Sequence, residues 1–178
     1  MKLGQIIPSV ELKRENGKIF KTSEKQPGQP FLFIFYASDC PYSRSYSDRF
    51  RKLFERYREE QLRIYLVSIV PDEITREDLV KKEIKIGGAD SRNFLMDEEW
   101  SAVNAFSIAS VPQAYLFGAN QRLVYKGAID DDWKNHDMVT RVYLEDALES
   151  TLDNVEVDFP EIDSVGTPVS QFVKGRSQ

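Results

Sequence analysis

The chain has 178 residues, of which 41% are hydrophobic and 30% are charged, and its formal net charge is −5. This length and composition are typical of one globular domain with a full hydrophobic core. The acidic balance argues against nucleic acid as a partner, and no stretch approaches the roughly 18 apolar residues that a membrane span needs.

Residues 1–30 are predicted to hold a strand pair and a loop. Residues 5–12 are mostly apolar, and Asn16-Gly17 is a strong signal for a hairpin turn. Thr22–Pro30 is polar and rich in proline and glycine, which is typical of a loop. No apolar segment of a signal peptide follows Met1. We therefore expect a cytoplasmic protein if Met1 is the native start, and an exported or periplasmic one if a signal has been removed.

The stretch around the only cysteine organises the chain. Phe31–Tyr36 is a short, aromatic run that favours a strand buried on both faces. Ser38 or Asp39 is expected to cap the helix that follows, and Pro41 suits the first turn of that helix. Cys40 is thereby placed where a central strand meets a helix N-terminus.

Two interpretations of Cys40 are open from its position alone. Backbone N–H groups converge at a helix N-terminus and stabilise a thiolate, which is the reactive form of cysteine. The alternative is a small buried apolar side chain, the commoner fate of a lone cysteine. The predicted strand–Cys–Pro–helix context favours the reactive thiol. A single cysteine excludes an internal disulfide and a metal site of several cysteines.

A helix is predicted from Pro41 to about Glu60, followed by a second buried strand over residues 62–70. The helix carries an apolar stripe at spacings of three and four. Its members are Phe50, Leu53, Phe54 and Tyr57. Strand, helix and strand in close succession imply a right-handed parallel crossover. The basic residues of this helix are interleaved with glutamates, so we expect a solvated face rather than a nucleic-acid surface.

The middle of the chain predicts three short elements. Thr75 with Asp78 is typical of a capped helix, which Gly87-Gly88 would end. Asn93–Asp97 is predicted to be a strand, and Glu98–Phe106 a helix with apolar residues at spacings of three.

The last third predicts a hairpin, a helix and a tail. Val111-Pro112 heads an apolar run, and its proline must open the strand because it cannot donate in a central ladder. The strand returns over Arg122–Gly127 after a turn. The last helix is expected from Asp137 to about Leu152, and residues 153–178 are expected to wrap the surface. The inward side chains of that helix are predicted to be Val139, Val142, Tyr143, Ala147 and Leu148.

The segment Asp130–Trp133 also has two interpretations. Three consecutive carboxylates are a combination that can hold Ca²⁺ or Mg²⁺. Their spacing matches no cation-binding loop, so a solvated turn is favoured and no metal is expected. His136, the only histidine, is interpreted as a surface or structural residue, and a Cys/His catalytic pair is not expected.

The strand–helix–strand unit with Cys-Pro at its junction, the Val-Pro hairpin and the closing helix together resemble the thioredoxin fold. The closer resemblance is to its redoxin branch of TlpA/ResA-like and AhpC/TSA-related proteins. Residues 35–44 are similar to the branch's Phe-Trp-Ala-x-x-Cys-Pro-x-Cys-Arg motif, and Gly4, Pro8 and Leu12 match its N-terminal pattern. The resemblance covers nearly the whole chain. It implies an α/β protein with a three-layer α/β/α thioredoxin-like fold, a mixed central sheet and an extra N-terminal β-hairpin. We expect one domain over residues 1–178, with the hairpin and loop in 1–30 and a tail in 153–178.

The chain departs from the branch at several places. Ser43 stands where the resolving cysteine is expected, which gives a Cys-x-x-Ser site, and Asp39 replaces the usual tryptophan. Gly166-Thr167 matches a Gly-Cys pair that some relatives carry near the C-terminus. Phe33 and Ala37 occupy the Pro and Thr places of the peroxidatic motif, so a peroxiredoxin is disfavoured.

The resemblance also implies roles for the residues around the cysteine. Cys40 is expected to be the nucleophile, and Pro112 a cis-proline that faces it. The backbone of Val111 is expected to pair with the substrate chain, and Pro41 and Tyr42 are further candidates for substrate binding.

Four neighbours of Cys40 keep two interpretations each. The Ser43 hydroxyl either donates a hydrogen bond to the thiolate or satisfies a backbone group. Asp39 either disfavours the thiolate by like-charge repulsion or caps the helix. Tyr36 and Tyr42 flank the cysteine and either line a groove or pack in the core.

Disulfide exchange needs one thiol to attack and a second to release the mixed disulfide, and this chain offers only the first. The predicted function is therefore a monothiol thiol–disulfide oxidoreductase with Cys40 and Ser43 as candidate catalytic residues. The expected partners are a disulfide- or thiol-bearing protein and, as the resolving thiol, glutathione or another low-molecular-weight thiol. No cofactor, metal, nucleic acid or membrane partner is expected. The alternatives are a redox-inactive binding or chaperone-like module, and a dithiol protein in which Ser43 is an engineered trap.

Overall fold

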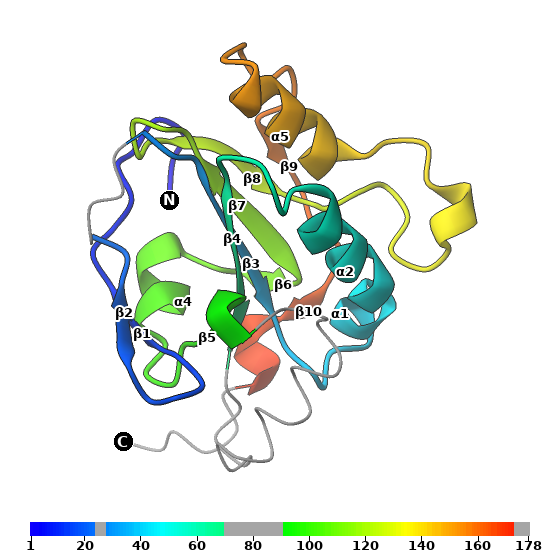
Figure 1. The fold of residues 1–178 in the computed structure, drawn as a ribbon. Coiled ribbons are helices and arrows are strands. Elements are labelled where there is room, and N and C mark those ends of the chain that lie inside the picture. Colours follow the sequence, from blue (N-terminus) through cyan, green and yellow to red (C-terminus); the bar gives the residue numbers. More distant parts are fainter. Residues whose placement is uncertain (24–27, 70–90, 173–178) are drawn as a thin grey trace.

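A mixed β-sheet forms the centre of the protein (Figure 1). A computed structural model of the chain describes residues 1–23, 28–69 and 91–172. The larger sheet runs in the order β2-β1-β5-β4-β3-β7-β8-β9, and a second small sheet pairs β10 with β6. The strands are β1 (Glu11–Lys13), β2 (Ile19–Lys21), β3 (Phe31–Tyr36), β4 (Arg63–Ser68), β5 (Phe94–Met96), β6 (Ser110–Val111), β7 (Gln113–Phe117), β8 (Leu123–Gly127), β9 (Glu161–Ile162) and β10 (Thr167–Pro168).

Helices cover both faces of this sheet. Figure 1 shows α4 on one side, and α1, α2 and α5 on the other. The helices are α1 (Pro41–Ser45), α2 (Ser47–Arg56), α4 (Ser101–Phe106) and α5 (Tyr143–Leu152), with 3₁₀ turns at η1 (Ser91–Asn93), η2 (His136–Met138) and η3 (Val169–Phe172). The predicted α/β class is thus confirmed. No helix among the described residues is long and apolar enough to span a bilayer.

Strand β3 is the central strand that its apolar sequence predicts. It pairs in parallel with β4 and antiparallel with β7, and each of its six residues is 3% exposed or less. Because side chains alternate along a strand, β3 supplies both hydrophobic cores. Phe31, Phe33 and Phe35 lie in the core beneath α4, and Leu32, Ile34 and Tyr36 lie in the core beneath α2 and α5.

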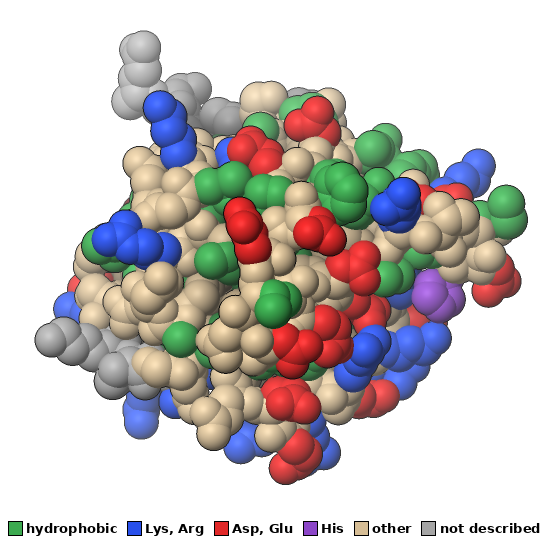
Figure 2. Space-filling view, turned by 90° about the horizontal axis from the view of Figure 1, so that it is seen from above, with side chains coloured by type: hydrophobic (Ala, Val, Ile, Leu, Met, Phe, Trp, Pro, Cys, Tyr) green, Lys and Arg blue, Asp and Glu red, His purple; other side chains and the backbone are tan. Residues whose placement is uncertain are grey.

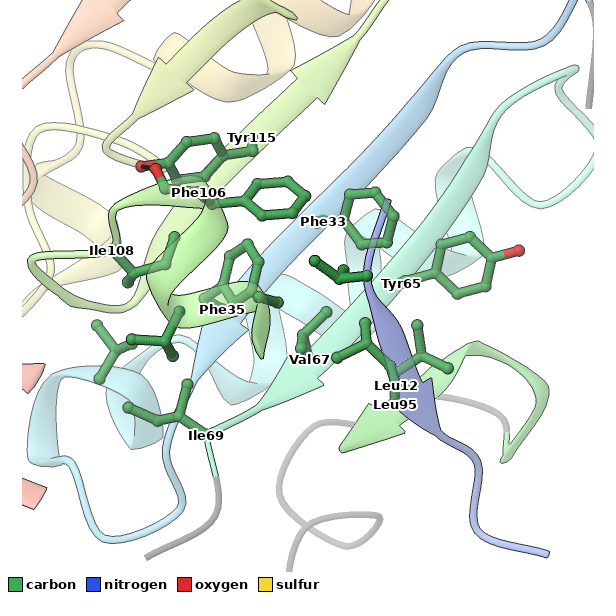
Figure 3. Close-up of a cluster of buried hydrophobic side chains, with 14 of the residues drawn as sticks. Leu12, Phe33, Phe35, Tyr65, Val67, Ile69, Leu95, Phe106, Ile108 and Tyr115 are labelled. Carbon is green, nitrogen blue, oxygen red and sulfur yellow. Dashed lines mark hydrogen bonds between the residues drawn. The ribbon is translucent and has the colours of Figure 1, made fainter. Parts of the chain in front are cut away.

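The core beneath α4 is built mainly from aromatic rings (Figure 3). The Phe33 and Phe106 ring centroids lie 5.9 Å apart at 74°, and those of Phe35 and Tyr115 lie 5.7 Å apart at 85°. Edge-to-face contacts of this kind add stabilisation beyond the burial of apolar area. The rings therefore fix β3, β7 and α4 against one another.

The predicted N-terminal hairpin is confirmed and extends the sheet. β1 and β2 pair antiparallel, with Gly17 in the turn at a φ of +80°, where a residue without a side chain is favoured. Lys13 in β1 pairs with Met96 in β5, so the hairpin joins the edge of the sheet. Thr75–Asp78 and Gly87-Gly88, where a short helix is predicted, lie outside the described residues.

The helix predicted over residues 41–60 is divided in two. α1 ends at Ser45, Tyr46 forms the break, and α2 ends at Arg56, four residues earlier than predicted. Tyr46 is buried, and its hydroxyl donates to an Asp130 oxygen at 2.7 Å. This long-range bond accompanies the break, and no local sequence pattern could predict it.

Helix α4 begins three residues later than predicted. Asp97 caps it, because its two carboxylate oxygens accept the N–H groups of Ala102 at 3.2 Å and Val103 at 2.7 Å. Trp100 adopts a left-handed φ of +55°, which a helix cannot include. Burial raises the pKa of the Asp97 carboxyl, and the backbone N–H groups that it accepts act in the opposite direction.

The predicted start of the last helix is also wrong. α5 begins at Tyr143 instead of Asp137. Asp131 accepts hydrogen bonds from both the backbone N–H and the hydroxyl of Thr140, which holds the preceding residues in a turn. In consequence Val142 is exposed, whereas Leu144, which was not predicted to face inward, is fully buried.

The tail adds strands to both sheets. β9 pairs in parallel with β8, and β10 pairs antiparallel with β6. A side chain at Gly127 would place its Cβ 1.8 Å from the carbonyl oxygen of Ile162, so only glycine allows β9 to approach. The expectation that this segment merely wraps the surface therefore misses its pairing. That residues 1–178 form one domain stays a prediction.

Replacing Phe33 by alanine tests the aromatic core. We expect the free energy of unfolding to fall by about 3–5 kcal/mol, because the ring is buried among aromatic neighbours and leaves a cavity. Urea denaturation followed by circular dichroism measures the change. Phe159→Ala is the control, since Phe159 is 55% exposed and should lose about 0.5 kcal/mol or less. Similar losses in the two variants would contradict this account of the core.

A second prediction concerns alkaline pH. Burial raises the pKa of Tyr115 to about 12, and its hydroxyl donates to the Phe106 carbonyl. Because the folded state holds this proton more tightly than the unfolded state, the contribution to stability is full below pH 10 and is lost as pH rises through about 12. Urea unfolding at pH 8 and pH 11 should show a smaller loss for Tyr115→Phe than for the parent chain. Equal losses would contradict it.

Candidate functional site

Cys40 lies directly after β3 and begins helix α1. It is itself the N-cap: its backbone is extended, and its sulfur accepts the backbone N–H of Ser43 at 3.4 Å. The prediction that Ser38 or Asp39 caps the helix is therefore wrong. The helix starts at Pro41, as expected, so the residue directly before it is Cys40, and the three-residue capping distance runs from Cys40 to Ser43. Pro41 occupies the first turn, as predicted.

Three elements surround the sulfur of Cys40. Besides the Ser43 N–H, it lies 3.3 Å from the carbonyl oxygen of Val111, to which the thiol donates, and 3.0 Å from the Thr167 hydroxyl oxygen. Cys40 is only 1% exposed. The Ser43 N–H and the Thr167 hydroxyl are the groups here that can donate to a thiolate, whereas the Val111 carbonyl suits the protonated thiol. The sulfur thus has both hydrogen-bond donors and an acceptor among its neighbours.

The Ser43 hydroxyl takes the second of its two expected roles. It accepts the backbone N–H of Ala37 at 3.3 Å, and the residue is fully buried. The contact from Ser43 to the sulfur is made by its backbone N–H instead. Ser43 therefore fixes the turn from β3 into α1 and aims an N–H group at Cys40.

The Val111–Pro112 turn faces the cysteine. The Val111–Pro112 peptide bond is cis, and β7 begins at Gln113 immediately after it, so the proline opens the strand. The Val111 carbonyl points at the sulfur. The backbone of β6 is already paired with this chain's own tail, in which Thr167 lies opposite Val111.

Thr167 is the contact that sequence reasoning did not assign. Its position was noticed only as the match to a Gly-Cys pair in some relatives. The preceding Gly166 explains how the tail comes so near: a Cβ there would lie 2.3 Å from the Val111 carbonyl oxygen and 3.3 Å from the Pro112 nitrogen. The sequence signal that could indicate this contact is Gly166, a glycine directly before a polar residue.

A cavity of about 390 Å³ adjoins the buried cysteine. Its lining residues come from the start of α1 and from the tail, and they are Asp39, Pro41, Tyr42, Gly166, Thr167, Pro168, Gln171 and Phe172. Asp39 is exposed and lines this space instead of capping the helix. Tyr42 packs on Trp133 with ring centroids 4.4 Å apart. Tyr36, by contrast, points into the core on the other face of the sheet.

The acidic loop after β8 is a buried ionic network. Arg49 lies 2.5 Å from one Asp130 oxygen, and Tyr46 donates to the other. Arg49 also donates to the carbonyl oxygens of Asp132 at 2.7 Å and Trp133 at 2.8 Å. Burial and the hydrogen bond to Asp130 raise the pKa of Tyr46. The expected solvated turn is therefore wrong for Asp130, which is 7% exposed and fixes the loop that carries Trp133.

The described residues contain no group of three or more His, Cys, Asp or Glu side chains that could hold a metal ion. Arg51 pairs with Glu55 of its own helix, as the interleaved pattern predicts, whereas Arg56 pairs with Glu145 of α5. Figure 2 shows one face of the protein, where acidic side chains gather with Lys and Arg around them. His136 is exposed.

Comparisons with known proteins agree with the observed fold. The AhpC/TSA family matches residues 3–126. A hypothetical protein from Sinorhizobium meliloti has a similar structure, with a TM-score of 0.80, 26% identity, and coverage of 95% of this chain and 94% of its own. An uncharacterised conserved protein from Geobacillus kaustophilus has a TM-score of 0.81 at 22% identity, covering 94% and 91%. A thiol:disulfide interchange protein of the thioredoxin family from Chlorobium tepidum has a TM-score of 0.61 at 15% identity, covering 85% and 99%. No curated protein matches the chain.

Replacing Asp130 by alanine tests the network beneath the loop. We expect a loss of about 3 kcal/mol in the free energy of unfolding, because the Arg49 guanidinium stays buried without its carboxylate. Thermal or urea unfolding measures it, and Trp133 fluorescence reports whether the loop leaves Tyr42. Lys134→Ala is the control, since that side chain is exposed and should change stability by about 0.5 kcal/mol or less. If the two variants are equally stable, the network does not hold the loop.

Proposed function

Because the chain belongs to the AhpC/TSA family, we propose that it is a thioredoxin-like thiol–disulfide oxidoreductase that uses one nucleophilic cysteine, Cys40. The main support for the proposal is the set of groups around the Cys40 sulfur. It lies at the start of α1 with the Ser43 N–H 3.4 Å away, opposite the carbonyl of Val111 that precedes Pro112. A donor aimed at the sulfur stabilises the thiolate, which is the attacking species.

The reaction needs two exchange steps. In the first, the Cys40 thiolate attacks one sulfur of a substrate disulfide, so that a mixed disulfide forms and the other substrate sulfur leaves as a thiolate. In the second, the thiolate of an external thiol attacks the mixed disulfide at the substrate sulfur. Cys40 leaves as the thiolate, and the substrate carries a new disulfide with the external thiol. No net oxidation or reduction of the chain occurs.

Ser43 enters this scheme as a positioning residue. Its hydroxyl cannot act as a resolving thiol, and it is engaged with the Ala37 N–H. What Ser43 supplies is its backbone N–H, which approaches the sulfur in both steps and favours Cys40 as the leaving thiolate.

Substrate binding is assigned to the surface around the turn and the cavity. The Val111 carbonyl faces the sulfur and Pro112 follows it in the cis turn, while Pro41 and Tyr42 line the adjoining cavity of about 390 Å³. A disulfide- or thiol-bearing protein is the proposed substrate, and glutathione or another small thiol is the proposed resolving agent. The mechanism assigns no role to a cofactor or metal.

A second candidate is a redox-inactive binding or chaperone-like module with the same fold. The burial of Cys40, which is 1% exposed, favours this alternative. The two candidates differ in what the sulfur contributes. Cys40→Ala abolishes exchange in the first case and leaves partner binding intact in the second.

Incubation with glutathione disulfide tests the proposed function. We expect the folded chain to gain one glutathionyl adduct, seen by intact mass, and to lose it on addition of reduced glutathione, because Cys40 both attacks and leaves. Cys40→Ser should gain none. Ser43→Ala should still gain the adduct, since the backbone N–H at that position is retained.

The same reaction in urea shows whether Cys40 is chemically intact. If the unfolded chain forms the adduct and the folded chain never does, the folded protein is not an oxidoreductase, and the binding module is the better account.

A further inference from the structure

The C-terminal segment Ser164–Val169, here called the strap, lies along the edge of β6. Thr167 pairs with Val111 and Pro168 with Ser110, in antiparallel register. The pairing continues at one end, where the Val169 N–H donates to the Ala109 carbonyl at 2.9 Å. The strap therefore uses the backbone that the proposed function assigns to a substrate strand.

The strap also covers the reactive atom. The Thr167 hydroxyl oxygen is 3.0 Å from the Cys40 sulfur, which places a side chain of the strap where a substrate sulfur must arrive to be attacked. Cys40 is 1% exposed in this arrangement. A disulfide cannot reach the sulfur along the β6 edge while Thr167 is in place.

Close approach at Gly166 holds the strap against the turn. A Cβ at this position would lie 2.3 Å from the Val111 carbonyl oxygen and 2.7 Å from its carbon, which real contacts do not allow. Glycine is required at position 166 because the backbones of the strap and of Val111 lie too close together for a side chain. Any residue with a side chain here must push the strap away from Val111.

The attachment of the strap is short. Two residue pairs form the ladder, and Val169, which is 5% exposed, anchors one end in the core beneath α4. At the other end Val165 is 61% exposed. Just beyond the strap Phe172 packs on the same core, and the Ser164 hydroxyl lies 3.4 Å from that of Ser110. A ladder of two residue pairs is the kind of local structure that opens without global unfolding.

We propose that the strap is an internal competitor of the substrate: it occupies the β6 edge in the resting protein, and Cys40 becomes reactive only when the strap lifts. That a substrate strand binds at the β6 edge when the strap lifts rests on the proposed function. The covering of Cys40 does not, and it is tested with reagents that need no redox cycle.

The first experiment loosens the strap. Gly166→Val should raise the rate at which iodoacetamide alkylates Cys40 in the folded chain by about tenfold or more, because the added side chain shifts the closed–open equilibrium toward the open form. Val165→Ala is the matched control and should leave the rate unchanged, since that side chain is exposed. Circular dichroism and the urea midpoint confirm that both variants are folded. An unchanged rate in folded Gly166→Val overturns the proposal.

The second experiment fastens the strap and does not depend on the first variant folding. In Thr167→Cys, diamide should remove one hydrogen from each of the two thiols and be reduced to a hydrazine, leaving an intramolecular disulfide between positions 40 and 167. Intact mass, thiol titration and non-reducing gels identify it, and alkylation of Cys40 should stop until dithiothreitol is added. Failure to form this disulfide within one chain overturns the proposal.

The experiments can disprove the closing of the strap and the oxidoreductase function independently of each other. If both variants behave as expected and neither the parent chain nor Gly166→Val forms a glutathionyl adduct, the strap stands and the oxidoreductase function falls. If the parent chain and Gly166→Val form the glutathionyl adduct at the same rate, the oxidoreductase function stands and the strap does not control access to Cys40.

Discussion

The double burial of β3 is the constraint on which the rest of the structure depends. Its odd residues pack beneath α4 and its even residues beneath α2 and α5, so a shift by one residue would exchange the two cores. Parallel pairing with β4 and antiparallel pairing with β7 remove the remaining freedom along the strand. The end of β3 is therefore fixed in space, and Cys40 follows it by only four residues. The position of the Cys40 sulfur is therefore set mainly by the strand that precedes it.

What surrounds the sulfur comes from parts of the chain that lie far apart in sequence. Ser43 contributes from the same helix, Val111 from the turn before β7, and Thr167 from the tail. The site is thus assembled by the sheet, which brings the turn to β3, and by the small β6–β10 pairing, which brings the tail to the turn. The proposed substrate binding and the pairing of the tail both involve the same short stretch of backbone at Val111.

The elements set by local patterns were predictable from sequence, and those set by long-range contacts were not. The apolar run at Phe31–Tyr36 and the proline at position 112 act on their own neighbours, so the central strand and the start of β7 were found. The break at Tyr46 depends on Asp130, and the late start of α5 depends on the Asp131–Thr140 bonds. Asp130 is far from Tyr46 in the sequence, and Asp131 lies before the segment whose apolar pattern predicts the last helix. Thr167 was missed for the same reason, because only the tertiary fold brings position 167 to position 40.

The position of Thr167 next to Cys40 affects how the cysteine reacts with oxidants. A sulfenic acid formed at Cys40 has no other thiol in the chain to condense with, because the sequence contains one cysteine and the atom facing it is a hydroxyl oxygen. Exposure to peroxide would then lead toward the irreversible sulfinic and sulfonic acids unless a small thiol intercepts the intermediate. The burial of the Cys40 sulfur therefore limits its contact with oxidants, in place of the protection that an internal disulfide would give.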